Sequence, residues 1–113
     1  VVLNVWGQWC GPCRGEADDL EDVYEATKSL GVEFLGINVR DESQTAAQDF
    51  VVSNNVSYAS IYDPPIRTLT SVIPTTVVLD RQHRVAAVFL RELLAEDLQP
   101  VVERVAAEEP VQQ

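Results

Sequence analysis

The stretch VVLNVWGQWCGPC, residues 1–13, joins an apolar run to two closely spaced cysteines. The run ends at Gly7, and apolar side chains recur at helical spacing after Cys13, which predicts a buried strand, a tight turn and a helix. Free backbone N–H groups and the helix dipole favour a thiolate at such a junction. We therefore predict that Cys10 is an exposed nucleophile and that Cys13 is the shielded resolving thiol. Gly11 and Pro12 suit the turn between them.

Outward from this stretch, strands and helices alternate along one domain of residues 1–113. The first helix continues to Thr27, and Gly31 stops it. The patterns then predict a strand at 32–39, a helix that is capped by Ser43 and ends near 54–55, and a strand at 58–62. After these we expect one or two helical turns before Pro74 and a hairpin of strands at 75–80 and 84–90. The chain then closes with a helix over 93–105 and a frayed tail at 108–113. This order predicts the α/β class, with a mixed sheet covered on both faces in three layers.

Composition narrows the range of functions. The chain has 113 residues, a net charge of −10, 46% hydrophobic and 23% charged residues, which is typical of one folded domain. Such a negative charge disfavours nucleic acid and anionic lipid surfaces as partners. Two thiols do not fill a four-ligand zinc site, and the single histidine, His83, has no ligand pattern around it, so we expect no metal. Because the chain opens on an apolar strand and contains no methionine, we expect it to be a fragment that lacks preceding residues.

Two motifs carry a resemblance to the thioredoxin superfamily. Residues 6–14 resemble the thioredoxin active-site segment, and Ile73-Pro74-Thr75-Thr76 resembles the loop whose cis-proline faces the dithiol. The stretch 41–63 resembles the central insertion of the TlpA-like branch, whose N-terminal hairpin is absent here. The resemblance implies a thioredoxin-like fold, a monomer, and no cofactor beyond a redox-active Cys10–Cys13 disulfide. It also implies a catalytic role for Pro74 and substrate contacts at the residues Trp9, Gly11, Pro12, Ile73 and Thr75.

One departure from the family concerns the proton of the resolving thiol. Thioredoxins of the cytoplasm carry a buried aspartate where this chain has Asn4, and an amide does not accept a proton. Some TlpA-like members are thought to use an acid at the start of the insertion. Asp41 and Glu42 are therefore both candidates, with Glu42 the first choice, and the alternative is that both are solvated carboxylates at a helix start. For the acids of the first helix, Glu16 included, we expect one of two roles. The early ones interact favourably with the N-terminal end of the helix, and the rest form a solvated face.

The resemblance implies a thiol–disulfide oxidoreductase that reduces protein disulfides outside the cytoplasm. The Gly-Pro pair between the cysteines is the one found in thioredoxin, at the reducing end of known potentials. The implied client is apocytochrome c, the implied electron source is a membrane thiol donor, and the implied tether is an N-terminal anchor. The alternatives are a general reductase or oxidase of secreted proteins, a copper chaperone, and a peroxidase on the same fold.

Overall fold

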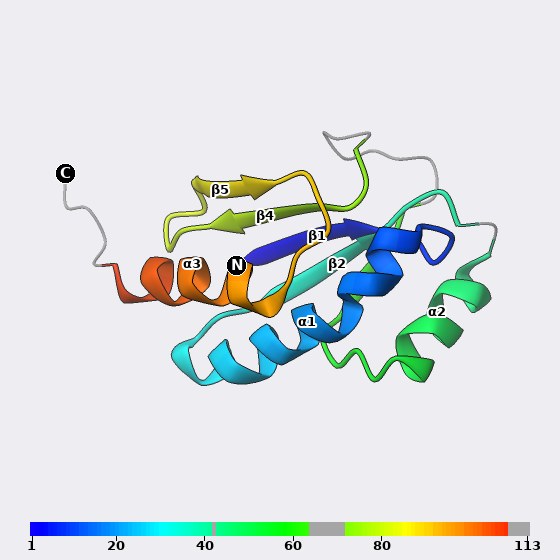
Figure 1. Ribbon diagram of the computed structural model, residues 1–113, viewed down its shortest axis with the longest axis horizontal. Coiled ribbons are helices and arrows are strands. Elements are labelled where there is room, and N and C mark those ends of the chain that lie inside the picture. Colours follow the sequence, from blue (N-terminus) through cyan, green and yellow to red (C-terminus); the bar gives the residue numbers. More distant parts are fainter. Residues whose placement is uncertain (42, 64–71, 109–113) are drawn as a thin grey trace.

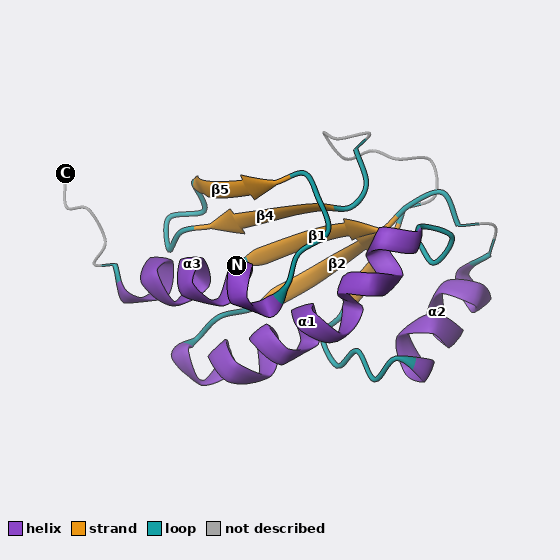
Figure 2. Cartoon of the chain, viewed as in Figure 1, coloured by secondary structure: helices purple, strands orange, loops and turns teal. Residues whose placement is uncertain are grey.

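The computed structural model describes residues 1–41, 43–63 and 72–108, and shows a five-stranded sheet with three α-helices (Figures 1 and 2). In chain order the elements are β1 (Val2–Trp6), α1 (Gly11–Thr27), the short 3-10 helix η1 (Lys28–Leu30), β2 (Phe34–Asn38), α2 (Gln44–Ser53), β3 (Ser60–Tyr62), β4 (Thr75–Leu79), β5 (Val85–Phe89) and α3 (Ala95–Ala107). The helical turns expected before Pro74 and the tail from 109 onward lie outside the described residues.

The sheet is mixed, with strand order β3-β2-β1-β4-β5. β1 pairs in parallel with β2 and antiparallel with β4, and β5 continues the antiparallel side as the predicted hairpin. Because β1 and β2 run in parallel, their C-terminal ends share one edge with the N-terminal end of β4. That edge therefore collects three loops: the one with the two cysteines, the one that follows β2, and the one with Pro74.

The main core lies where α1 and α3 pack on each other and on the sheet (Figure 2). The buried residues of this core come from the sheet, from α1 and α3, and from the loops between them: Val2, Leu20, Val23, Val32, Phe34, Tyr58, Val78, Leu93, Leu98, Val102 and Val105. A second, smaller cluster contains the two cysteines with Trp6 and Ala47. α2 joins this second cluster through its apolar face, so the segment that precedes β3 closes over the cysteine end of the sheet.

Local signals for helix ends operate close to the predicted positions, although α1 itself ends at Thr27 and the glycine stop acts on the η1 turn that follows. The Oγ of Ser43 accepts a hydrogen bond from the Ala46 N–H at 3.1 Å and so caps α2. Gly31 has a φ of 84°, in the left-handed region that glycine adopts without strain, and it terminates η1. Among the described residues, no helix is long and apolar enough to cross a bilayer.

Candidate active site

The two cysteines form a disulfide at the start of α1. Their Cα atoms are 5.2 Å apart. Cys10 is the N-cap residue of α1, and its sulfur accepts a hydrogen bond from the Cys13 N–H at 3.2 Å. This N–H is one of the backbone donors that a helix start leaves without a partner in the helix, so the predicted junction of turn and helix is confirmed.

Exposure does not distinguish the two sulfurs in this state. Cys10 is 5% exposed and Cys13 is 4% exposed, so the prediction that Cys10 is the exposed member of the pair is wrong for the disulfide form. The physical reason is that the bond holds the Cys10 sulfur against the buried Cys13, inside the cluster with Trp6 and Ala47. By contrast, Gly11 and Pro12 are exposed and Trp9 keeps 46% of its surface exposed, beside the disulfide.

The loop before β4 lies against the same cluster. Ile73 packs on the group formed by the cysteines, Trp6 and Ala47, and the Ile73–Pro74 bond is cis, as the family resemblance implies. Pro74 and Thr75 are buried. The Thr75 hydroxyl donates a hydrogen bond to the Val72 carbonyl. The side chain that was expected to contact substrate is therefore bonded to its own loop.

The loop that follows β2 holds the turn that precedes the disulfide. The Trp9 indole N–H donates to the Val39 carbonyl at 3.1 Å, and the Gln8 N–H donates to Asp41 Oδ2 at 3.2 Å. The Arg40 guanidinium lies 6.0 Å from the centre of the Trp9 ring. These contacts position the exposed indole beside Cys10.

Asp41 is only 4% exposed, so the alternative that it is a solvated carboxylate is wrong. Its Oδ2 also accepts a hydrogen bond from the Asn38 side chain, and the Tyr62 hydroxyl donates to its backbone carbonyl at 3.2 Å. The last residue of β2 and the turn before the disulfide thus both bind the carboxylate. Glu42, the other candidate proton acceptor, lies outside the described residues.

Glu16 is a buried acid near the disulfide helix start that the sequence analysis did not single out as a site candidate. Its side chain is fully buried, which contradicts its placement among the helix-start and solvated acids of α1. Oε1 accepts a hydrogen bond from Asn4 Nδ2 at 2.9 Å, and Oε2 accepts one from the Leu93 N–H at 3.0 Å. Glu16 also lies three residues after Cys13, so both side chains fall on the buried face of α1.

Burial raises the pKa of Glu16 from 4.5 to about 7, against the two hydrogen bonds, which lower it. The nearby carboxylates of Glu92 and Asp19 raise the pKa further. Periodicity offered a signal for this placement, because positions 13, 16, 20, 23 and 27 form one stripe along the helix and all of them are buried. An acid with a pKa near neutral, on the same buried helix face as a resolving thiol, is suited to exchanging a proton with it.

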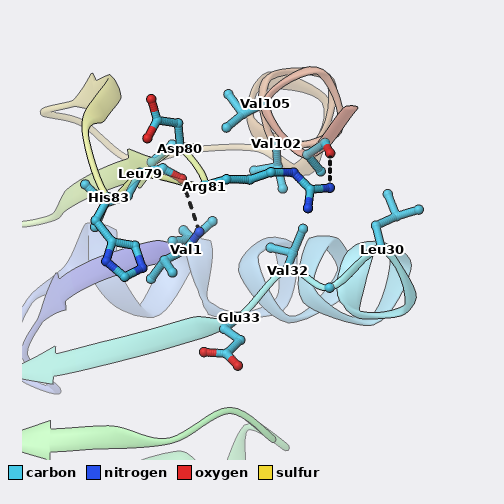
Figure 3. A pocket seen from close by; sticks show the side chains of 14 residues that line it. Val1, Leu30, Val32, Glu33, Leu79, Asp80, Arg81, His83, Val102 and Val105 are labelled. Atoms are coloured by element: carbon cyan, nitrogen blue, oxygen red, sulfur yellow. Dashed lines mark hydrogen bonds between the residues drawn. The ribbon is translucent and has the colours of Figure 1, made fainter. Parts of the chain in front are cut away.

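The opposite end of the sheet carries different features. A pocket of about 330 Å³ opens there, lined by residues that include Val1, Val32, Leu79, His83 and Val105 (Figure 3). His83 lies in the turn between β4 and β5, with a φ of 61°, at the strand ends remote from the disulfide. Within the described ranges, no group of three His, Cys, Asp or Glu side chains is arranged to hold a metal ion.

The mixed sheet, the disulfide at the start of α1 and the proline loop opposite it together define a thioredoxin-fold protein. Residues 1–90 match the AhpC/TSA family, and the chain belongs to that family. It is 35% identical over 92 residues to the thiol-disulfide oxidoreductase ResA of Bacillus subtilis (strain 168), in an alignment that covers 78% of this chain and 51% of ResA. The chain therefore spans about half the length of that relative.

Two solved structures are more similar in sequence. A secreted thiol-disulfide isomerase from Corynebacterium glutamicum is 50% identical with a TM-score of 0.90, covering 95% of this chain and 70% of that one. A DsbF homologue from Corynebacterium diphtheriae is 54% identical with a TM-score of 0.86, covering 91% of this chain and 69% of that one. The resemblance to thioredoxin-fold oxidoreductases of the TlpA-like type is thereby confirmed.

Proposed function

We propose that this protein is a thiol–disulfide oxidoreductase that reduces disulfides in proteins. The observation that carries the proposal is the Cys10–Cys13 disulfide at the N-terminus of α1, with Ile73 and the Pro74 loop packed against it. The relatives named above are a thiol-disulfide oxidoreductase and a thiol-disulfide isomerase, which supports the same chemistry here.

In the proposed reaction the reduced protein begins as a dithiol. The Cys10 thiolate attacks one sulfur of the substrate disulfide, forms a mixed disulfide, and releases the first substrate thiol. Cys13 then attacks Cys10, releases the second substrate thiol and closes the Cys10–Cys13 bond. Two electrons and two protons pass to the substrate. Glu16 is the acid placed to accept the proton that Cys13 must lose before its attack, since it lies one turn further along the same buried face.

The proposed working place is outside the cytoplasm, with a membrane thiol donor restoring the dithiol and an N-terminal anchor as the tether. The C. glutamicum neighbour is described as secreted, which favours this compartment. The proposed client is the oxidised Cys-x-x-Cys-His segment of apocytochrome c, as the TlpA-like resemblance implies. A second candidate is isomerisation or oxidation of disulfides in secreted proteins, which the name of the same neighbour favours.

The test combines exchange kinetics with an equilibrium potential. Reduced protein is mixed with an oxidised Cys-x-x-Cys-His peptide and with a control peptide of the same spacing that lacks the histidine, and released thiols are followed. Cys13→Ser should trap a mixed disulfide through Cys10, and Cys10→Ser should trap none. No exchange with either peptide would overturn the proposal.

The potential separates the candidates. Equilibration with a glutathione or dithiothreitol buffer should give a value near that of thioredoxin, about −270 mV, for a reductant. A value near that of DsbA, about −120 mV, would instead favour the oxidising candidate. Peroxide consumption or tight copper binding without disulfide exchange would favour the two remaining alternatives on this fold.

A further inference from the structure

The hydrogen bonds of Glu16 suit only one of its two protonation states. Both carboxylate oxygens accept from N–H donors, Asn4 Nδ2 on one side and the Leu93 backbone on the other. With the side chain fully buried, water does not replace either partner freely. A proton added to Oε1 at the lone pair that faces Asn4 would place its O–H against the N–H of Asn4, leaving two donors facing each other without an acceptor.

Of the two partners, only Asn4 is able to reverse its polarity. The Leu93 N–H belongs to the backbone and remains a donor. The Asn4 amide exchanges its oxygen and nitrogen by a half-turn about its terminal side-chain bond, and then presents Oδ1 to the Glu16 O–H. The other neighbour of Asn4 tolerates this change, because Nδ2 lies 3.1 Å from Thr76 Oγ1, and a hydroxyl either accepts or donates.

Asn4 also connects the acid to the resolving cysteine. Both Asn4 and Cys13 line a small cavity of about 20 Å³ between β1, α1, α2 and the segment that precedes β3. The Asn4 side chain therefore adjoins Cys13 through this cavity and contacts Glu16 directly. A half-turn of the amide changes which of its polar atoms faces Glu16, and it moves the other atom at the same time.

We propose that Asn4 is a positioning residue that acts as a reversible amide switch, donating from Nδ2 to the Glu16 carboxylate and accepting through Oδ1 from the protonated acid. The switch keeps Glu16 hydrogen-bonded both before and after Glu16 takes the proton of Cys13. This role rests on the proposed function, because it requires the exchange chemistry described above. Because burial raises the pKa of Glu16 to about 7, both states are populated near neutral pH.

The other titratable groups around Glu16 are accounted for by element. On α1 they are Cys13, which the disulfide removes from titration in the oxidised protein, and Asp19. Glu92 faces Glu16 from the loop between β5 and α3. Tyr58, from the segment before β3, has a pKa that burial raises well above its usual range, so it stays neutral. For Glu16 itself, burial places the pKa near 7.

The experiment is a pH titration of the oxidised protein by NMR between pH 5 and 9, with labelled glutamate carboxyls and side-chain amides. Contacts between the Asn4 amide protons and the Thr76 side chain should be present at high pH and lost at low pH, with the same midpoint as the Glu16 carboxyl. Asn38 is the internal control, because it is an equally buried amide paired with Asp41, and its contacts should not follow that midpoint.

Two results would overturn the proposal. The first is a Glu16 titration during which the Asn4 contacts stay unchanged, since a purely electrostatic effect moves a resonance without exchanging neighbours. The second is an Asn4→Leu variant whose Glu16 midpoint lies below that of wild type. This variant loses both the Nδ2 donor to the carboxylate and the Oδ1 acceptor of the acid, and the bond to the ionised group is the stronger of the two, so we expect the midpoint to rise and the pH profile of resolution to move with it. If this variant does not fold, the wild-type titration decides alone. If either result is obtained while the protein still exchanges disulfides normally, the amide switch is refuted and the proposed function is not affected.

Discussion

Replacing Glu16 by glutamine should change how the stability of the protein depends on pH. In the folded protein the pKa of Glu16 is about 7, against 4.5 for an unburied glutamate. Each pKa unit corresponds to about 1.36 kcal/mol, so this rise corresponds to about 3 kcal/mol. Between the two values the folded state binds the proton and the unfolded state does not. The favourable contribution is therefore complete below pH 4.5 and is lost as the pH rises through 7.

The assay is urea unfolding of the disulfide form at several pH values from 4 to 8.5, for wild type and Glu16→Gln. Glutamine resembles the protonated acid and does not titrate. The difference in unfolding free energy between the two proteins should thus be constant at low pH and change by about 3 kcal/mol, in favour of the variant, by pH 8. Asp18→Asn is the matched control, because Asp18 is an exposed acid on the same helix.

The refuting result is a difference curve that stays flat within about 1 kcal/mol across this range. It would mean that Glu16 titrates in the folded protein as it does in the unfolded chain, so that burial does not govern its pKa. The same change in the Asp18→Asn control would assign the effect to net charge. Either outcome would remove the basis for Glu16 as the acceptor of the Cys13 proton.

Three further predictions concern the site and its surroundings. After reduction, limiting iodoacetamide at neutral pH should modify Cys10 before Cys13, because Cys10 lies at the free helix start; peptide mass mapping would reveal the reverse order. Asp41→Asn should slow disulfide exchange less than Glu16→Gln in stopped-flow measurements, since the Asp41 carboxylate holds the turn before the disulfide; a larger effect would restore Asp41 as the proton acceptor. Ser43→Ala should lower the unfolding free energy by about 1 kcal/mol through loss of the α2 cap, and an unchanged urea midpoint would contradict this.

Structural features that depend only on residues adjacent in the chain could be predicted from the sequence. The strand, turn and helix around Cys10 rest on an apolar run, a proline suited to the first turn, and a spacing of three that lets the two sulfurs meet. The cap at Ser43 and the helix stop at Gly31 are equally local. Their geometry is set within four or five residues, so a pattern in the sequence suffices to predict them.

Features that depend on burial were decided by the tertiary structure. Glu16 became a buried acid because Asn4, twelve residues earlier, and Leu93, 77 residues later, converge on its two oxygens. Asp41 is buried because the end of β2 and the turn before the disulfide pack on its carboxylate, and Cys10 is buried because its sulfur is bonded inside a cluster. The pKa of a carboxyl group depends on the water and charges around it in space. Which acids of this chain are buried, and with which partners, was therefore decided only by the packing of distant segments.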